Sequence, residues 1–424
     1  MTVVRRTRAR VMKNVVLVSA VFLTVLWAWA GPGHRSAGAA SSGVIEGLSR
    51  LAGDGAVMAM DAKGRILASH HPDKPLVPAS VLKIITAAVA LEELGPAYRF
   101  TTLFRSTPQG DLLVSGRGDP FLVSEELDRI AEALRAQGLV RVRNVLLDNR
   151  FFEPGLVLHG TNRSLNPYDA YNGALCVNFN TVYVQVDARG RVHSGEPQTP
   201  LTDIARRAAH RGGVKGKARI NLSASPDQCL RYAGELLRAF LQRKGVEVTG
   251  DIKKCEEDPE VFPLLYVHQS ARTLADLLED VFRYSNNFMA NQIFLALGAS
   301  RFGPPATPEK ARRVMTAFMK DTGIEDIHVE EGSGLSRRTR ITAGQMINVL
   351  DRFRPYRDLL GCKDGVCSKT GTLHDVKSLA GYLLPDAGDP VSFVILLNGP
   401  EYGYPSRDRI FTLLRDNLLS GPSE

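Results

Sequence analysis

Three short segments that together could build one catalytic centre lie far apart in this chain of 424 residues. Residues 80–83 read Ser-Val-Leu-Lys, residues 285–287 read Ser-Asn-Asn, and residues 369–372 read Lys-Thr-Gly-Thr. A serine hydroxyl needs a base before it can attack a carbonyl, and a nearby lysine can take the place of a histidine. A shared site would require the two ends of the chain to fold together, with the middle of the chain as an insertion.

The first segment predicts a nucleophile and its base. On a helix, residues three apart lie on one face, so Lys83 can sit beside the Ser80 hydroxyl. Lysine accepts a proton near neutral pH only if burial and neighbouring positive charge lower its pKa, and Lys369 could supply that charge. The apolar run at residues 84–88 indicates a buried helix start. Taken alone, this pattern is more often an exposed pair on a helix, so the prediction depends on the other two segments.

The third segment predicts a substrate-binding strand edge. Gly371 would let a ligand backbone approach the strand, and Lys369 with the hydroxyls of Thr370 and Thr372 could hold a substrate carboxylate. The backbone N–H groups of Thr372 and Ser80 could form an oxyanion hole. For this tripeptide alone, a surface turn with a solvated lysine is the better interpretation.

The second segment is the least specific, because Ser-x-Asn also occurs at residues 164–166. That copy lies in a polar stretch rich in proline and tyrosine, which indicates a loop. Residues 285–287 instead interrupt two amphipathic helices, which would hold a hydroxyl and an amide rigidly against a site. We therefore predict that Ser285 relays a proton to the leaving amine, and that Asn287 orients Lys83 and the substrate amide.

The charge pattern separates the first 40 residues from the rest. Residues 1–30 contain five basic residues and no acid, so their removal takes the formal net charge from +8 to +3. That balance gives no electrostatic footprint for nucleic acid. A basic stretch, the apolar run at residues 15–30 and small residues after it predict an export signal or N-terminal membrane anchor with its linker at residues 1–40. The expected location is the periplasm or cell wall, with membrane association left open.

The chain has five cysteines, and disulfide bonds can form among them if it is exported as expected. Cys362 and Cys367 enclose a short loop, and Cys229 and Cys255 bracket a helix-like segment, so either pair could bridge and Cys176 would be left over. No cysteine and histidine set has zinc-ligand spacing. We expect no metal and no cofactor.

Periodicity indicates the domain organisation. A hairpin at residues 57–69 and three strands within residues 368–397 can form one five-stranded antiparallel sheet flanked by helices. Between about residues 98 and 260, short strands alternate with helices. We therefore predict a discontinuous domain at residues 41–97 plus 261–424, split by an inserted α+β domain at residues 98–260. The expected helices lie at residues 79–94, 124–137, 232–244, 273–284, 289–297, 308–322, 343–352 and 407–419.

With these segments in order, the chain resembles the D-alanyl-D-alanine carboxypeptidase/endopeptidase family, the class C low-molecular-mass penicillin-binding proteins. The resemblance covers roughly residues 45–420. Further family landmarks are residues 76–80, 116–120, 147–151, 178–181, 332–337 and 368–373. The second segment departs from the family's common Ser-Asp-Asn at its tolerant middle position. The insertion and the stretch between the second and third segments look short, so a third small domain is expected to be reduced or absent.

The resemblance implies an α/β fold with a β-lactamase/transpeptidase-like core. It also implies a serine DD-peptidase that cleaves D-alanyl-D-alanine termini or D-amino-acid cross-links of peptidoglycan stem peptides, with β-lactams as inhibitors that acylate Ser80. Asp148 resembles an acid of the inserted domain that meets the substrate's free amine. Arg337 is expected to approach the stem peptide.

Three other functions share these residues. A β-lactamase would deacylate quickly through a well-placed water, and a transpeptidase would pass the acyl group to an amine. A peptidoglycan-binding scaffold would keep the fold without chemistry. The intact Ser80, Lys83 and Lys369 argue against the scaffold.

Overall fold

The computed structural model describes residues 42–162, 164–222, 225–325, 327–386 and 388–419. The predicted export signal at residues 1–40 lies outside these ranges. Within them, no helix is both long enough and apolar enough to cross a membrane.

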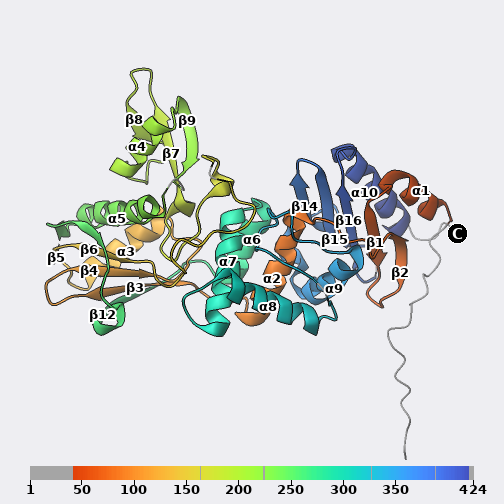
Figure 1. Ribbon diagram of the computed structural model, residues 1–424, viewed down its shortest axis with the longest axis horizontal. Coiled ribbons are helices and arrows are strands. Elements are labelled where there is room, and N and C mark those ends of the chain that lie inside the picture. Colours follow the sequence, from red (N-terminus) through yellow and green to blue (C-terminus); the bar gives the residue numbers. More distant parts are fainter. Residues whose placement is uncertain (1–41, 163, 223–224, 326, 387, 420–424) are drawn as a thin grey trace, which may run out of the picture. The chain divides into compact units, whose positions relative to one another are not determined.

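An antiparallel sheet joins the two ends of the chain (Figure 1). Its strand order is β13-β14-β15-β16-β1-β2, and the pairing of β1 with β16 places Val57 opposite Ile395. The expected sheet of five strands is present, with the two-residue strand β13 added at one edge. The strands are β1 (Ala56–Met60), β2 (Ile66–His70), β13 (Cys362–Lys363), β14 (Val366–Leu373), β15 (Val376–Leu383) and β16 (Val391–Asn398).

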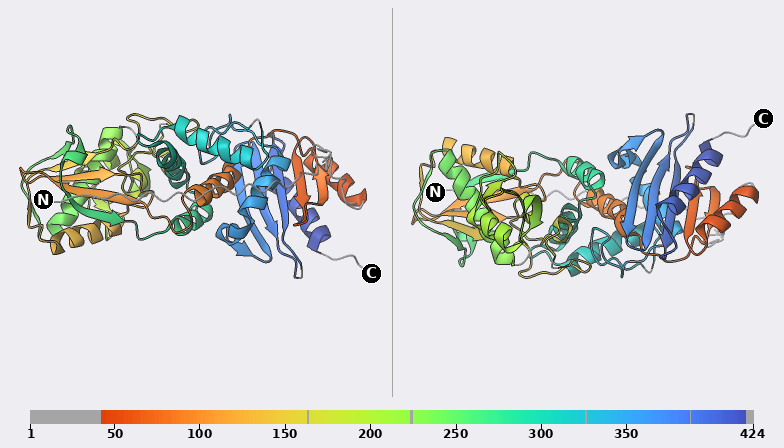
Figure 2. Two further views of the ribbon diagram at one scale, coloured as in Figure 1. Left: turned by 90° about the horizontal axis from the view of Figure 1, so that it is seen from below. Right: turned by 90° about the horizontal axis from the view of Figure 1, so that it is seen from above.

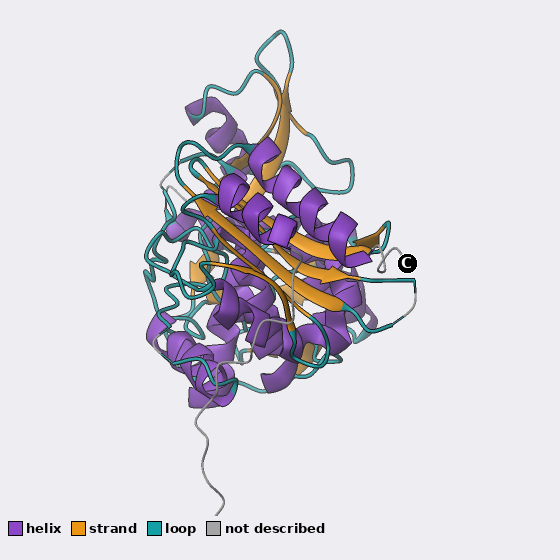
Figure 3. Cartoon of the chain, turned by 90° about the vertical axis from the view of Figure 1, so that its right-hand side faces the viewer, coloured by secondary structure: helices purple, strands orange, loops and turns teal. Residues whose placement is uncertain are grey.

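Helices cover both faces of this sheet because successive strand residues point to opposite sides. Val57 and Phe393 pack with α1 (Ser42–Ala52) and α10 (Tyr404–Leu419), whereas Met58 and Val394 belong to the larger cluster on the other face. Figure 2 shows helices on both sides of the sheet, and Figure 3 shows α1 and α10 lying across its strands. The helices of the larger cluster are α2 (Leu82–Glu93), α6 (Leu274–Arg283), α7 (Asn287–Phe302), α8 (Pro308–Asp321) and α9 (Ala343–Phe353).

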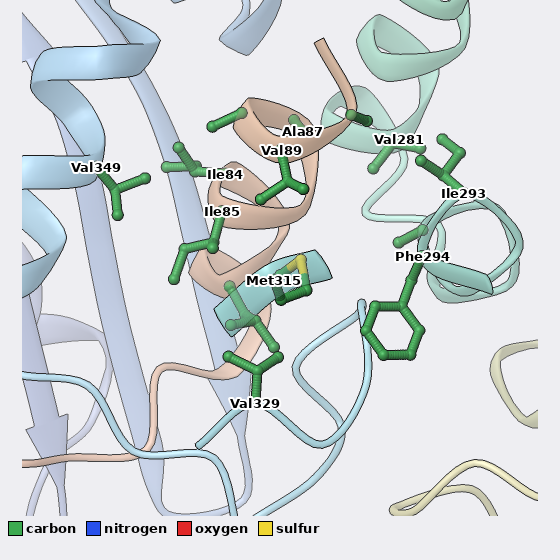
Figure 4. Packing of buried hydrophobic residues seen from close by; sticks show 14 of the residues in the cluster. Ile84, Ile85, Ala87, Val89, Val281, Ile293, Phe294, Met315, Val329 and Val349 are labelled. Carbon is green, nitrogen blue, oxygen red and sulfur yellow. The ribbon is translucent and has the colours of Figure 1, made fainter. Parts of the chain in front are cut away.

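Helix α2 is the centre of the larger cluster. Residues Leu82 to Leu91 are all buried, which is the pattern of a helix surrounded by protein on every side. In Figure 4, Ile84 points toward Val349 of α9, while Val89 lies on the side of α6 and α7. The first turn of α2, which carries Lys83, is therefore held by packing along the whole helix.

The middle of the chain builds three further sheets with their own hydrophobic cluster. A five-stranded sheet has the order β11-β6-β4-β3-β12, and its strands β3 and β12 bring the chain out and back side by side, with Thr101 opposite Gln269. The strands of these sheets are β3 (Thr101–Ser106), β4 (Leu112–Gly116), β5 (Arg141–Val142), β6 (Val145–Asp148), β7 (Thr181–Val186), β8 (Val192–Ser194), β9 (Gly216–Asn221), β10 (Glu247–Val248), β11 (Ile252–Lys254) and β12 (Leu264–Gln269). Helices α3 (Ser124–Ala136), α4 (Asp203–Arg211) and α5 (Pro226–Arg243) accompany them.

Two further features of the middle region bear on the predicted domain organisation. It includes the small three-stranded sheet β8-β7-β9 together with α4, and the expectation that a third small domain is reduced or absent stays a prediction. Phe152, Leu158 and Cys176 also pack into the larger cluster rather than the cluster of the middle region. The parts of the chain around residues 152–158 and Cys176 therefore lie against the helices that surround α2.

One of the two possible disulfides is formed. Cys362 and Cys367 are bonded and tie β13 to β14, directly before Lys369. Cys229 and Cys255 are free, buried thiols, as is Cys176, so the second possible bridge is absent. Cys229 lies within α5 and Cys255 directly follows β11, so each is packed as a small apolar side chain.

A substitution in the larger cluster tests its role in stability. Phe294 of α7 is fully buried there (Figure 4), so Phe294→Ala should lower the free energy of unfolding by about 3–5 kcal/mol through lost burial and the cavity left behind. Denaturant unfolding followed by fluorescence measures the change. Phe302→Ala removes an exposed ring from the end of the same helix and should change stability by less than about 0.5 kcal/mol. Equal effects of the two substitutions would contradict this assignment of the core.

Candidate active site

The first predicted segment forms a short turn followed by a buried helix. Ser80 lies in a 3-10 turn, Ala79–Val81, and Lys83 is in the first turn of α2. The Lys83 Nζ lies 2.9 Å from Ser80 Oγ, 2.7 Å from Asn287 Oδ1 and 2.7 Å from the Ser333 carbonyl oxygen. A protonated lysine has three N–H donors, so these three oxygens satisfy it fully. In its neutral form the same amine can accept the proton of Ser80.

The surroundings of Lys83 favour that neutral form. Its side chain is fully buried, and burial together with the nearby charge of Lys369 lowers the pKa of Lys83, while the charge of Glu331 raises it. The net effect brings the pKa of Lys83 to about 7. At neutral pH a substantial fraction of Lys83 is therefore unprotonated and can act as a base.

The second segment forms the junction between α6 and α7. Asn286 caps α7, since its Oδ1 accepts a hydrogen bond from the Met289 amide at 3.0 Å. Asn287 is the first residue of α7 and presents its side-chain oxygen to Lys83. Ser285 has a φ of 50°, which turns the chain sharply between the two helices. Among the described residues, no hydrogen bond involves the Ser285 hydroxyl.

The other Ser-x-Asn, at residues 164–166, lies in a loop. Ser164 donates its hydroxyl to Asp169 within that loop. The hydrogen bonds of this loop are local or reach β9, where Asn221 donates to the carbonyl groups of Ser164 and Asn166. The amide that contacts Lys83 is that of Asn287.

The third segment lies on β14, pressed against the turn that carries Ser80. A methyl group at Gly371 would lie 2.8 Å from the Pro78 carbonyl oxygen and 2.9 Å from the Ser80 amide nitrogen. Both are backbone atoms that cannot swing aside, so only glycine allows this approach. Beyond Cys367, no strand of the described residues pairs with the outer edge of β14. That edge is therefore free to pair with an extended peptide backbone.

Lys369 supplies positive charge beside this edge. Only 5% of its surface is exposed, its Nζ donates to the Thr370 carbonyl oxygen at 2.8 Å, and burial lowers the pKa of Lys369 to about 8. The side chains of Thr370 and Thr372 are exposed on the same strand. The arrangement can bind an anionic group that arrives from solvent.

Glu331 is a buried member of the site that the motifs did not reveal. Its carboxylate accepts backbone N–H groups from Ser333 and Gly334, each at 2.7 Å, and from Ser336 at 3.2 Å. The Ser333 hydroxyl also donates to it. These bonds hold the loop so that the Ser333 carbonyl reaches Lys83. An acid placed directly before a Gly-Ser-Gly turn is the signal that could have identified it.

The two remaining predicted site residues, Arg337 and Asp148, have different surroundings in the structure. Arg337 forms an ion pair with Asp375, which follows β14, so it lies close to the end of that strand. Asp148 ends β6, where its carboxylate accepts hydrogen bonds from Arg150 at 2.8 Å and 3.2 Å. Among the described contacts, none joins Asp148 to Ser80, Lys83 or Asn287.

The described residues contain one grouping with metal-ligand geometry, Asp358 with Cys362 and Cys367. The two sulfur atoms are bonded to each other, so neither is a thiolate that could bind a metal.

A serine with a buried lysine of lowered pKa, an amide on that lysine and an open cationic strand edge define an acyl-transfer enzyme of the active-site serine class. Comparison with known families identifies which one. Residues 46–360 and 352–414 match the family described as D-Ala-D-Ala carboxypeptidase 3 (S13). The chain belongs to this family. It is therefore a serine-type D-Ala-D-Ala peptidase that acts on peptidoglycan, and the resemblance drawn from the motifs is confirmed.

Individual relatives agree with this assignment. The D-alanyl-D-alanine carboxypeptidase DacB of Haemophilus influenzae is 24% identical over 408 residues, covering 80% of this chain and 84% of the relative. A D-alanyl-D-alanine carboxypeptidase of Actinomadura sp. is 26% identical over 419 residues, covering 81% and 77%. The crystal structure of penicillin binding protein 4 from H. influenzae superposes with a TM-score of 0.73 at 21% identity, covering 89% of this chain and 99% of that one. The predicted fold class is confirmed.

The contact between β14 and Ser80 gives a steric prediction. Gly371→Ala should lower the rate of serine acylation at least about 100-fold, because the strand must move away from the nucleophile. Stopped-flow measurement with a chromogenic β-lactam reports the rate. Gly344→Ala is the matched control, since a methyl group there would come no closer than 3.6 Å to its neighbours. An unchanged rate in Gly371→Ala would contradict the close approach of β14.

The lowered pKa of Lys83 gives a pH prediction. If the neutral amine of Lys83 is the reactive form, the acylation rate should increase as the pH rises through about 7, the pKa of Lys83. Lys369→Gln removes a neighbouring positive charge, so the pKa of Lys83 should rise and the acidic limb should move to higher pH, even though the maximum rate also falls.

The control for this shift is Lys363→Gln, which removes an exposed charge from β13 of the same sheet. Its pH profile should match that of the unmodified protein. A profile of Lys369→Gln with the acidic limb unmoved would show that the two lysines are not coupled.

Proposed function

We propose that Ser80 is the nucleophile of this peptidase and that Lys83 is its general base. The observation that carries the proposal is the 2.9 Å contact between the fully buried Lys83 Nζ and the Oγ of Ser80, which is partly exposed. The contact thus explains the burial of a lysine that would otherwise be expensive to fold.

The reaction follows from this geometry. Ser80 Oγ forms a bond to the carbonyl carbon of the scissile amide as its proton passes to Lys83, and the N–H groups of Ser80 and Thr372 stabilise the oxyanion. The carbon–nitrogen bond then breaks, and the departing amine receives a proton through the Ser285 hydroxyl, which returns Lys83 to its neutral form. Water attacks the resulting ester and releases the shortened peptide. Asn287 holds Lys83 and the substrate amide in register throughout.

The substrate is a stem peptide that ends in D-alanyl-D-alanine or is joined by a D-amino-acid cross-link. Lys369, with the hydroxyls of Thr370 and Thr372, binds the carboxylate next to the scissile bond, and Gly371 gives the peptide room along β14. Arg337 contacts the stem peptide, a role supported by its ion pair with Asp375 beside β14. Asp148 binds the free amine of the stem peptide, for which it must first release Arg150.

β-Lactams inhibit the enzyme by the same route. Their strained amide reacts with Ser80 and leaves an ester that hydrolyses slowly. A solved structure of the H. influenzae relative is a complex with a β-lactam, and it superposes on this chain with a TM-score of 0.67.

The location and domain organisation are part of the proposal. Residues 1–40 export the protein to the periplasm or cell wall, as a cleaved signal or as an anchor. Residues 41–97 plus 261–424 form the peptidase domain and residues 98–260 the insertion. The separate hydrophobic clusters support two domains, and Phe152, Leu158 and Cys176 belong to the part of the insertion that packs on the peptidase. Strand β12 (Leu264–Gln269) pairs with β3, so the sheet of the insertion extends beyond the predicted boundary at residue 260.

Labelling with a reporter penicillin tests the proposal. The purified protein should carry one stable adduct, which peptide mass mapping locates on Ser80. Ser80→Ala should abolish the adduct and lower D-alanine release from a pentapeptide by about 10⁴-fold or more. Ser49→Ala, an exposed serine in α1, should change neither. Intact penicillin without an adduct would favour a scaffold, destroyed penicillin without an adduct a β-lactamase, and transfer to an added amine a transpeptidase.

A further inference from the structure

A cavity of about 680 Å³ opens beside the second motif. Ser285 and Asn287 form part of its wall at the junction of α6 and α7. Aromatic rings of Phe121, Tyr168 and Phe179, all from the middle of the chain, line it as well. A group bound at this end of the cavity therefore touches Ser285 and Asn287, which the proposed function places beside the scissile bond.

One of these rings is carried by an unusual backbone. Asn178, Phe179 and Asn180 have φ angles of 50°, 58° and 51°, so three successive residues with side chains adopt the left-handed conformation. This conformation brings Cβ close to the following carbonyl oxygen, and residues other than glycine seldom adopt it in a row. It persists only where the surrounding structure enforces it, commonly at ligand-binding sites.

Buried hydrogen bonds enforce it here. The Asn178 side chain accepts the Ser124 amide at 2.9 Å and donates to the Ser124 hydroxyl at 2.9 Å and the Tyr232 hydroxyl at 3.2 Å. The Asn180 side chain donates to the Tyr171 carbonyl oxygen at 2.7 Å. The two asparagines therefore pin the turn from both sides.

The consequence of this turn is the position of Phe179. Asn178 and Asn180 are only 6% and 0% exposed, whereas Phe179 between them is half-buried and faces the cavity. Its ring meets those of Phe121 and Phe288 in edge-to-face geometry, at centroid distances of 6.2 Å and 6.0 Å. Phe288 directly follows Asn287, so Phe179 connects the middle of the chain to the catalytic helix.

The charges around the cavity indicate what it binds. Arg219 and Asp280 are the charged residues in its wall, and they pair with Glu196 and Arg272 respectively. The cavity thus offers aromatic surface without an unpaired cation, whereas the cation assigned to the substrate carboxylate, Lys369, lies on β14. A carboxylate is suited to β14, and an uncharged apolar group is suited to the cavity.

We propose that Phe179 determines specificity in this enzyme, as the wall of a subsite for an apolar or aromatic side group on the acyl-donor side of the scissile amide. The assignment to the acyl donor follows because the proposed function directs the leaving residue's carboxylate to Lys369 of β14, which is not among the residues that line the cavity. This inference rests on the proposed function, since the cavity borders Ser285 and Asn287. The left-handed turn at Asn178, Phe179 and Asn180 holds the Phe179 ring in the wall of the cavity.

Two penicillins that differ only in their side group test the subsite. Benzylpenicillin carries an aromatic ring on its side-chain amide, and 6-acetamidopenicillanic acid carries a methyl group in the same place. Phe179→Ala should lower the second-order rate constant for acylation by benzylpenicillin about tenfold, the scale of one lost aromatic contact, and change that of the acetamido compound less than about twofold. Phe302→Ala, an exposed ring at the far end of α7, should change neither rate.

A second variant protects the test against misfolding. Tyr168 lines the same cavity and is 53% exposed, so Tyr168→Ala removes a ring of the subsite with little effect on packing, and it should give the same selective loss. Equal losses for both penicillins, or no loss for either, would overturn the subsite. Failure of the unmodified protein to acylate Ser80 with either penicillin would instead overturn the proposed function.

Discussion

The burial of the Lys83 amine is the constraint on which the rest of the structure depends. An amine without water must find other partners, and here three oxygens from three separate parts of the chain meet it: Ser80, Asn287 and Ser333. Bringing these parts together requires α2 to be packed on all sides, α7 to begin beside it, and the 331–336 loop to fold inward. The same burial lowers the pKa of Lys83, which is what its proposed role as the general base requires.

The sheet places β14 against the turn that carries Ser80, the proposed nucleophile. β14 approaches Ser80 so closely that Gly371 leaves no room for a side chain, and the disulfide at Cys362 and Cys367 ties the preceding residues to β13. The pairing of β1 with β16 then joins the two ends of the chain around the middle region. The site is thus held between a sheet and a helix, both of them rigid.

The middle region also packs against the helices that carry the candidate site. Its residues Phe152, Leu158 and Cys176 pack on the helices around α2, and its left-handed turn places Phe179 against Phe288 of α7. Strained backbone held by buried asparagines is a stable way to present a side chain at a defined position. Sequence patterns do not reveal such a turn, because Asn-Phe-Asn fits several conformations equally well.

The sequence by itself determined the motifs, the class of enzyme, the sheet with its flanking helices and the positions of most elements, because these follow from local periodicity and from the chemistry of Ser80, Lys83 and Lys369. It left the cysteine pairing open, and the acid before the Gly-Ser-Gly turn did not by itself show the role of Glu331, which arises only when its loop folds against α2. It predicted that Asp148 meets the substrate, which stays a prediction, and it did not show that this carboxylate pairs with Arg150 in the fold. Tertiary structure alone decides such matters, because the partner of a buried polar group is chosen by packing between segments distant in the chain, which local sequence does not encode.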